Sequence, residues 1–228
     1  MFFEQYVTAQ DHWLAPDNYQ EHPVAVLAHR TSPTNMGLSL LANVSAYDMG
    51  YISAGALLAR CGNSLHSMQQ LDRHAGHFFN WYDTLTLMPL SPRYVSSVDT
   101  GNLAGHLLTL RPALLALADQ PIVHPRAFEG LLDVLGNLQQ ALPVQANASW
   151  RQGVMHLTQR VEVACAVPPS TLSEAVQALA SIEDGLQRIG GEQAAVMHAP
   201  DHGHAHALAD QRSQAGLPVG QASGGDSK

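Results

Sequence analysis

The stretch Ser32-Pro-Thr-Asn-Met-Gly-Leu-Ser-Leu-Leu-Ala-Asn-Val-Ser-Ala-Tyr47 decides the class of fold that this chain is expected to adopt. It opens with serine at the position of a helix N-cap and proline at the first helical position, a combination typical of helix starts. Its apolar side chains then follow a helical period, at Met36, Leu40, Val44 and Tyr47. This spacing indicates an amphipathic α-helix rather than a strand. We therefore expect a helix that begins at Pro33 and ends at Gly50.

Helical periodicity of the same kind marks six further segments. They cover residues 2–12, 53–76, 99–112, 125–142, 150–165 and 171–191. Pro112 is expected to kink or break one helix, and Gly190-Gly191 to end the last one. A short hairpin at Phe78–Tyr82 is the only strand structure that the pattern suggests. The predicted fold class is all-α, with about seven helices in consecutive antiparallel hairpins.

The composition limits the kinds of partner. Apolar residues make up 46% of the 228 residues, enough for a sizeable core. With 11 basic and 19 acidic residues the net charge is −8, so we expect no nucleic-acid partner. No window approaches the ~18 apolar residues of a membrane span. Cys61 and Cys165 lie in helical patterns, typical of buried thiols in a reducing compartment, which favours a cytoplasmic location.

The C-terminal region has a different composition. Beyond Ala199 it is rich in His, Ala, Gly, Gln and Ser without an apolar period, so we expect disorder. We therefore divide the chain into a helical domain, residues 1–191, and a tail, residues 192–228. Four histidines there have a spacing compatible with a transition metal: His198, His202, His204 and His206. A tail without supporting residues favours a solvated tract, and no metal site is predicted.

Few other motifs for chemistry are present. There is no P-loop, dinucleotide fingerprint or nucleophile elbow, and no cofactor is predicted. His74 and His77 lack a neighbouring cysteine or carboxylate, so we interpret them as structural histidines. Four glutamates on polar helix faces are expected to be solvated, namely Glu129, Glu162, Glu174 and Glu183.

Polar chemistry is concentrated in His77-Phe-Phe-Asn-Trp-Tyr-Asp83 and Tyr94-Val-Ser-Ser-Val-Asp-Thr-Gly-Asn-Leu-Ala-Gly105. These runs hold two carboxylates, two carboxamides and a Trp-Tyr pair, at Asp83, Asp99, Asn80, Asn102, Trp81 and Tyr82. Aromatic rings can cover a sugar face, while Asp and Asn can pair with hydroxyl groups. Each residue taken alone favours a structural role: Asp99 as a helix N-cap, Trp81 as a core anchor, Asn80 as a turn residue.

The positions of the polar motifs favour function. The run His29–Asn35 leads into one predicted helix, and the run Ser97–Asn102 leads into the next helix but one. Alternate helices of antiparallel hairpins point the same way, so the two helix N-termini should lie on one face. Helix N-termini offer free N–H groups to anionic or hydroxyl ligands.

Four motifs, in this order, resemble cyclic β-1,2-glucan synthases. They are Trp13-Leu-Ala-Pro-Asp-Asn-Tyr-Gln20, Ala28-His-Arg-Thr-Ser-Pro-Thr-Asn-Met-Gly37, Gly76-His-Phe-Phe-Asn-Trp-Tyr-Asp-Thr84 and Pro92-Arg-Tyr-Val-Ser-Ser-Val-Asp-Thr-Gly-Asn-Leu-Ala-Gly105. The resemblance extends from residue 1 to about residue 135. Three positions depart from the family pattern: Leu85 replaces a basic residue, Thr100 a serine and Ala15 a proline. The change at Leu85 puts sugar binding at that point in doubt.

The resemblance implies the start of a glucoamylase-like (α/α)6 barrel that closes linear β-1,2-glucan into rings by transglycosylation. In that family the barrel follows a membrane-embedded glucosyltransferase and precedes a phosphorylase-like domain. Retaining chemistry needs two carboxyl groups about 5–5.5 Å apart, which we expect downstream of the matching motifs. A closed ring needs more helices than the seven predicted, so the resemblance implies a partial toroid, a fragment that a frameshift or incomplete gene would explain. The expected location is cytoplasmic, as the soluble part of an inner-membrane enzyme.

The resulting hypothesis is a fragment of a glycan-processing enzyme, inactive by itself and with no catalytic residue assigned. Its expected partners are a β-1,2-glucan oligosaccharide and the remainder of the synthase polypeptide. The expected sugar contacts are Arg30, Asn35, Trp81, Tyr82, Asp83, Asp99 and Asn102. The alternative is a non-catalytic helical module that binds carbohydrate or serves as a scaffold.

Overall fold

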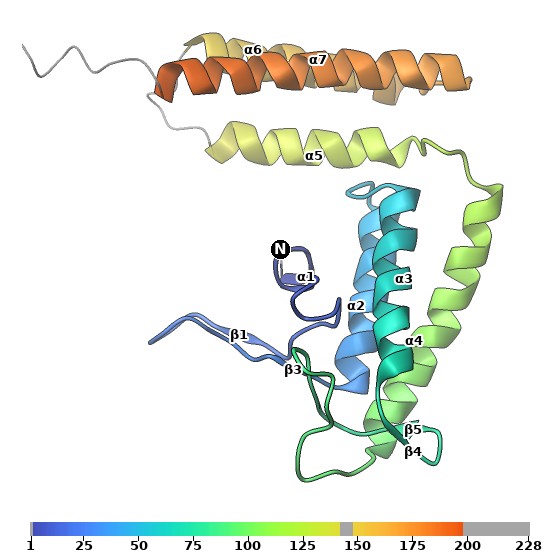
Figure 1. Ribbon diagram of the computed structural model, residues 1–228. Helices are drawn as coiled ribbons and strands as arrows, with labels where there is room; N and C mark the ends of the chain where they lie inside the picture. The colour runs from blue at the N-terminus through green and yellow to red at the C-terminus, as the bar shows by residue number, and fades with distance from the viewer. Residues whose placement is uncertain (1, 142–147, 198–228) are drawn as a thin grey trace, which may run out of the picture.

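The computed structural model describes residues 2–141 and 148–197, with side chains described as far as residue 190, and most of these residues are helical (Figure 1). The helices are α1 (Phe2–Tyr6), α2 (Pro33–Asp48), α3 (Ala54–Gln70), α4 (Ser97–Ala116), the short 3-10 helix η1 (Leu117–Asp119), α5 (Arg126–Ala141), α6 (Ala148–Ala166) and α7 (Leu172–Met197). The strands form three antiparallel pairs of two residues each: β1 (Tyr19–Gln20) with β2 (Val26–Leu27), β3 (Arg30–Thr31) with β6 (Tyr82–Asp83), and β4 (Arg73–His74) with β5 (His77–Phe78). The all-α prediction is confirmed.

The first layer consists of helices α2, α3 and α4 together with the N-terminal segment, residues 2–32, and the segment between α3 and α4, residues 71–96. Ser32 caps α2 by accepting the N–H of Asn35 at 3.3 Å, and Ser53 caps α3 by accepting the N–H of Ala56 at 3.2 Å. Helices α2 and α4 run side by side in the same direction, and α3 returns antiparallel to α2 (Figure 1). Their shared core includes Leu14, Met36, Leu40, Leu57, Cys61, Met68, Tyr82, Leu103 and Leu110.

The thiol of Cys61 belongs to this first core. Burial raises its pKa to about 11, and Cys165 on α6 is also a free, partly buried thiol. The prediction of buried thiols is thus confirmed for Cys61 and holds in part for Cys165.

Helices α5, α6 and α7 form a second layer across one end of the first (Figure 1). Its core is separate and includes Phe128, Leu135, Val154, Leu157, Val161 and Ile182. Helix α7 begins with the predicted capping box: Thr171 Oγ1 accepts the N–H of Glu174 at 3.2 Å, and Glu174 Oε2 accepts the N–H of Thr171 at 3.3 Å. Hydrogen bonds from the backbone and hydroxyl of Ser170 help to hold the pKa of the Glu174 carboxyl below its usual value.

The two layers meet where α2 ends. Gly50 has φ of +78°, the left-handed conformation that commonly ends a helix, and its missing side chain lets the backbone of Arg126 approach. A Cβ on Gly130 would lie 2.5 Å from the carbonyl oxygen of Gly50. The second layer therefore contacts the first through the backbone at Gly50, Arg126 and Gly130. Among the described residues α6 packs with α5 and α7. The partial (α/α)6 toroid stays a prediction.

Several predicted boundaries are wrong. Helix α1 ends at Tyr6 rather than residue 12. The chain then turns, with left-handed φ at His12 (51°) and Trp13 (59°), and Leu14 is buried in the core. Helix α3 ends at Gln70, before Gly76. The predicted hairpin at Phe78–Tyr82 is absent from the described residues, since these two residues pair with β4 and β3 instead.

Two helices continue through residues expected to interrupt them. Helix α4 passes through Pro112, whose missing N–H leaves the carbonyl of Leu108 without its usual partner. The side chain of Leu108 is 75% exposed, so that carbonyl lies on the solvated side of the helix. Helix α7 passes through Gly190-Gly191 to Met197, because buried Ile189 packs into the second core. The predicted tail thus starts inside α7, and the four tail histidines lie outside the described residues.

Candidate functional site

The strand pair β3–β6 joins two of the sequence motifs. Arg30 pairs with Asp83 and Thr31 with Tyr82, and the N–H of Thr84 donates to the carbonyl of His29 at 3.1 Å. The segment before α2 therefore lies against the segment that leads toward α4. This tertiary contact is what assembles the site.

A buried carboxylate anchors both sides of the strand pair. Asp11 Oδ1 lies 2.7 Å from Nδ1 of His29 and accepts the hydroxyl of Thr84 at 2.5 Å. His12 adds a contact between its Nδ1 and the carbonyl of Thr84 at 2.8 Å. The turn after α1 thus fixes His29, which precedes Arg30, and Thr84, which follows Asp83.

The N-termini of α2 and α4 are neighbours. Thr34, in the first turn of α2, donates its hydroxyl to Asp99 Oδ1 at 2.7 Å, and Asn102 Nδ2 donates to the same hydroxyl oxygen at 3.1 Å. The prediction that the two helix starts share a face is confirmed. Ser96 is the N-cap of α4, accepting the N–H of Asp99 at 3.1 Å, so the expectation that Asp99 is the cap is wrong. The Asp99 carboxylate is therefore available for contacts across the face.

Asn80 connects the aromatic motif to α4. Its amide is assigned with Nδ2 donating to Asp99 Oδ2 at 2.8 Å, because the carboxylate can only accept. Its Oδ1 then accepts the indole N–H of Trp81 and the hydroxyl of Tyr94, both at 2.7 Å. The side chain of Asn80 is buried, and it acts as more than the expected turn residue.

Arg30 connects the same indole to the loop after α1. Its guanidinium carbon lies 4.7 Å from the ring centroid of Trp81. Asp17 Oδ2 accepts from Arg30 Nε at 3.1 Å and from Nη2 at 2.9 Å, and Asp17 Oδ1 accepts from Asn35 Nδ2 at 3.2 Å. Asn35 follows Thr34 in α2, which closes a circle of contacts.

We call this arrangement the polar circuit. Its members are Asp17, Arg30, Thr34, Asn35, Asn80, Trp81, Asp99 and Asn102. Arg30 and Asn102 are exposed, while Asn35, Trp81 and Asp99 are partly exposed, so the circuit faces solvent. It offers amide, guanidinium, hydroxyl and carboxylate groups beside one indole, which suits a ligand rich in hydroxyl groups.

The carboxylates of the circuit are engaged by protein donors. Asp17 accepts from Arg30, Asn35 and Asn18, and Asp99 accepts from Thr34 and Asn80. A carboxylate nucleophile needs an oxygen that can attack the substrate, so this arrangement favours a binding role.

Tyr82 and Asp83, two predicted sugar contacts, support the site from within. Tyr82 is 0% exposed, donates its hydroxyl to the carbonyl of Asp72 at 2.6 Å and accepts the N–H of Phe79 at 2.7 Å. Burial raises the pKa of that hydroxyl. Asp83 Oδ1 accepts the N–H groups of Leu85 and Thr86 at 2.9 and 2.8 Å, which holds a tight turn.

Sequence reasoning missed Asp17, Thr34 and the full role of Asn80. Asp17 lies inside the first of the four motifs, so motif membership is the signal that could have identified it. Its partner Arg30 is distant in sequence, and no local pattern predicts their contact.

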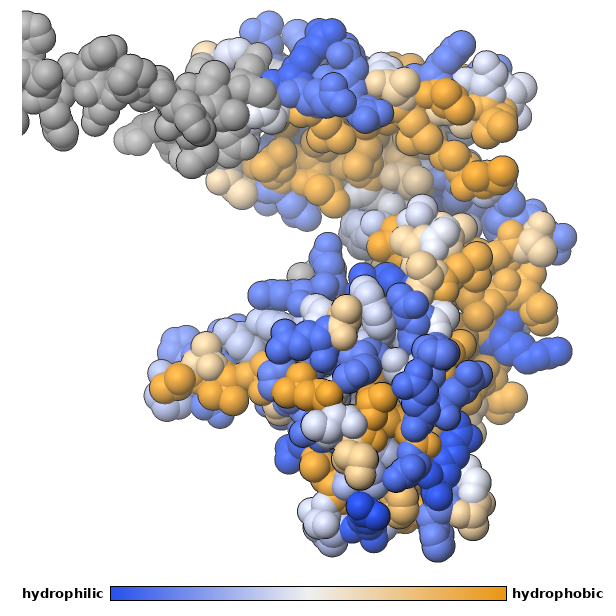
Figure 2. Space-filling model, in the orientation of Figure 1, coloured by the Kyte–Doolittle hydropathy of each residue, from blue (hydrophilic) through white to orange (hydrophobic). Residues whose placement is uncertain are grey.

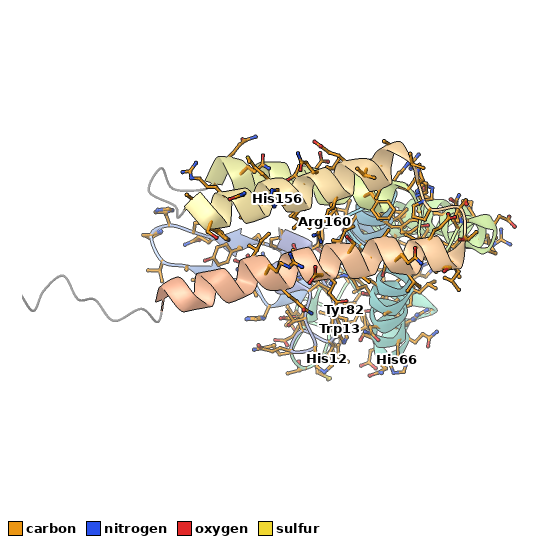
Figure 3. The ribbon with its side chains drawn as sticks, turned by 90° about the horizontal axis from the view of Figure 1, so that it is seen from above. His12, Trp13, His66, Tyr82, His156 and Arg160 are labelled. Carbon is orange, nitrogen blue, oxygen red and sulfur yellow. The ribbon has the colours of Figure 1, made fainter. Side chains whose placement is uncertain are left out.

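A cavity lies elsewhere, in the second layer. It has a volume of about 670 Å³ and lies between α6 and α7, lined by Arg160, Val163, Val167, Pro169 and Glu174 among others. Figure 3 places Arg160 and His156 on α6, whereas Tyr82, His12 and Trp13 belong to the first layer. The cavity is therefore separate from the polar circuit.

Within residues 2–141 and 148–197, no group of three or more His, Cys, Asp or Glu side chains could hold a metal ion. None of the helices in the same residues has the length and apolar character needed to span a bilayer.

Comparison with known proteins adds one relative. No protein-family model matches the chain. Over 142 residues, 62% of this chain, the sequence is 44% identical to the cyclic beta-(1,2)-glucan synthase NdvB of Rhizobium meliloti (strain 1021). The chain spans about 5% of the length of that relative. The identity supports a relationship between this chain and one segment of a cyclic β-(1,2)-glucan synthase.

Proposed function

We propose that this chain supplies a glycan-binding face to a cyclic β-1,2-glucan synthase, and that the polar circuit contacts the glucan. The observation that carries the proposal is the circuit itself. It joins residues from all four motifs that resemble the family, and it faces solvent. The 44% identity to a cyclic glucan synthase supports the same assignment.

The groups of the circuit suit a neutral sugar. Arg30 donates hydrogen bonds, the amides of Asn35 and Asn102 both donate and accept, and the indole of Trp81 provides an apolar surface. The charge of Arg30 is balanced by Asp17 at 2.9 Å. Hydroxyl groups can pair with such a surface without bringing a charge of their own.

In this proposal the residues have different roles. Arg30, Asn35, Trp81 and Asn102 contact the glucan, and Asp99 contacts it at its partly exposed edge while fixing Thr34 and Asn80. Tyr82 and Asp83 hold the backbone in place. The chain binds the glucan during transglycosylation, and the reacting carboxyl groups belong to other parts of the synthase.

We also propose that other parts of the synthase polypeptide pack against this chain. Large apolar side chains are exposed on α4 and α7 (Figure 2), among them Leu108, Leu115, Leu172 and Val176. Exposed apolar surfaces of this kind are typical of contacts with further protein.

The test is titration calorimetry of the full 228-residue chain with linear β-1,2-glucan. Asn102→Ala and Asp99→Ala are each expected to weaken binding about tenfold, since each removes hydrogen-bonding groups from the face. Asn137→Ala is the matched control, because Asn137 is exposed on α5 in the other layer. A linear β-1,3-glucan serves as the control sugar.

Absence of binding by the folded wild-type chain would count against the glycan-binding role. If Asn102→Ala and Asp99→Ala bind the glucan as tightly as wild type, the glucan binds at a surface other than the polar circuit. Product chromatography decides between the fragment and a non-catalytic binding module. In the fragment proposal, transfer activity depends on addition of the remaining synthase.

A further inference from the structure

Asp17 has more side-chain partners than any other carboxylate of the polar circuit. Its Oδ2 accepts from Arg30 Nε at 3.1 Å, from Arg30 Nη2 at 2.9 Å and from Asn18 Nδ2 at 3.0 Å. Its Oδ1 accepts from Asn35 Nδ2 at 3.2 Å. One carboxylate thus orients both a cation and an amide of the binding face.

The backbone around Asp17 is held in place as well. The N–H of Asp17 donates to the carbonyl of Ala28 at 3.2 Å, and the N–H of Ala28 donates to the carbonyl of Asn18 at 2.9 Å. The loop that carries Asp17 is therefore tied to the segment that immediately precedes the strand of Arg30. The side chain of Asp17 is 18% exposed and that of Arg30 is 50% exposed, so the carboxylate is the more buried partner of the pair.

An arginine side chain on a surface has many rotamers, and fixing one of them costs conformational entropy. Asp17 Oδ2 accepts from both Nε and Nη2 of Arg30, which holds that edge of the guanidinium toward the carboxylate. The guanidinium carbon lies 4.7 Å from the Trp81 ring centroid, and Nη1 lies on the side of the guanidinium away from the carboxylate. The carboxylate therefore holds Arg30 beside Trp81, so that one ligand can contact both side chains.

We propose that Asp17 is a positioning residue of the glycan site, acting through Arg30 and Asn35. This inference rests on the proposed function. Asp17 holds the Arg30 guanidinium against the Trp81 indole and orients the Asn35 amide. The glucan can then bind to three side chains whose positions are already fixed. Asp17 also pairs with the charge of Arg30.

The first experiment needs no ligand. In NMR spectra of the full chain, the Nε–H signal of Arg30 is assigned by its loss in Arg30→Gln. In wild type this proton is expected to exchange slowly with water, because Asp17 accepts it. In Asp17→Asn the exchange is expected to accelerate several-fold. The control is Asp119→Asn at the far end of α4, where the carboxylate is exposed and the Arg30 signal should not change.

The second experiment is a double-mutant cycle in glucan affinity. Asp17→Asn is expected to weaken binding of linear β-1,2-glucan about three- to tenfold, a range suited to a partly exposed ion pair. The double variant with Arg30→Gln should bind no more weakly than Arg30→Gln alone, apart from the share carried by Asn35. Asp17→Glu retains the carboxylate and is expected to recover part of the affinity. Thermal melts of each variant check folding.

The outcomes separate the inference from the function on which it rests. If wild type binds and Asp17→Asn binds equally well, the positioning role is overturned while the proposed function stands. Fully additive losses in the cycle would also overturn it, since Asp17 would then act independently of Arg30. If wild type fails to bind glucan, the proposed function itself fails, whatever the Arg30 signal shows.

Discussion

Asn80 is a buried residue of the site that joins three other side chains. Its buried amide satisfies a carboxylate, an indole N–H and a hydroxyl at once. Buried polar groups that lose such partners are costly, because they retain neither water nor a protein partner.

We predict that Asn80→Ala lowers the free energy of unfolding by about 2–3 kcal/mol, since it leaves the Trp81 N–H and one Asp99 oxygen without their partner. Denaturant unfolding measures the change. Asn63→Ala is the control, because Asn63 is exposed on α3 and alanine favours helix formation. A loss below about 0.5 kcal/mol for Asn80→Ala would mean that these contacts contribute little to stability.

At this scale the sequence predicted residue types better than roles. Arg30, Asn35, Trp81, Asp99 and Asn102 were singled out, and they lie in one circuit. What the sequence did not indicate is which atoms they engage. Those contacts depend on the strand pair, and the two strands are remote in sequence.

At the scale of elements, the starts of α2, α3 and α7 were predictable, whereas the start of α4 and the ends of α1 and α7 were not. Ser32, Ser53 and Thr171 accept N–H groups as cap residues do, and these hydrogen bonds are local. The ends of α1 and α7 depend on packing instead. After α1 the chain places Leu14 in the first core, and beside the two glycines of α7 Ile189 is buried in the second core.

The close approach of α2 and α4 yields an element-scale prediction. A Cβ on Gly37 would collide with the imidazole of His106 on α4, including its Cβ at 2.9 Å. Gly37→Ala is therefore expected to destabilise the chain by about 1–3 kcal/mol and to weaken glucan binding, because Thr34 and Asp99 would move apart.

The control for Gly37→Ala is Gly105→Ala on α4, where an added Cβ meets no atom of the described residues within 4 Å. That substitution should stabilise α4 by up to about 1 kcal/mol. Thermal melts and glucan titration of both variants check the pair. Equal behaviour of the two would show that the helices tolerate a wider separation.

At the scale of the whole molecule, the two layers have separate hydrophobic cores, so a substitution in one layer can leave the other layer unchanged. The polar circuit belongs entirely to the first layer, while the second layer has its own buried residues. The layers touch through Gly50 and Gly130, with Tyr51 donating its hydroxyl to Asp133 at 3.3 Å.

We predict that Gly130→Ala loosens the second layer and leaves the affinity for glucan unchanged. The added methyl would press on the backbone of Met49 and Gly50, at a cost of about 1–3 kcal/mol. Gly136→Ala on the same helix is the matched control, because its Cβ meets no described atom within 4 Å. Calorimetric melts should separate into two transitions in Gly130→Ala alone. A parallel loss of glucan affinity would show that the layers are coupled.

The strand pair β3–β6 has a consequence for how the protein forms. Helices α2 and α3 lie between its two strands along the chain, so the pairing closes a long loop. Closing such a loop costs conformational entropy. This cost falls once the α2–α3 hairpin between the two strands has folded, because the strands are then already close together. During synthesis on the ribosome, the binding surface is therefore completed only after the residues up to Asn102 have emerged, and it is among the last parts of the first layer to mature.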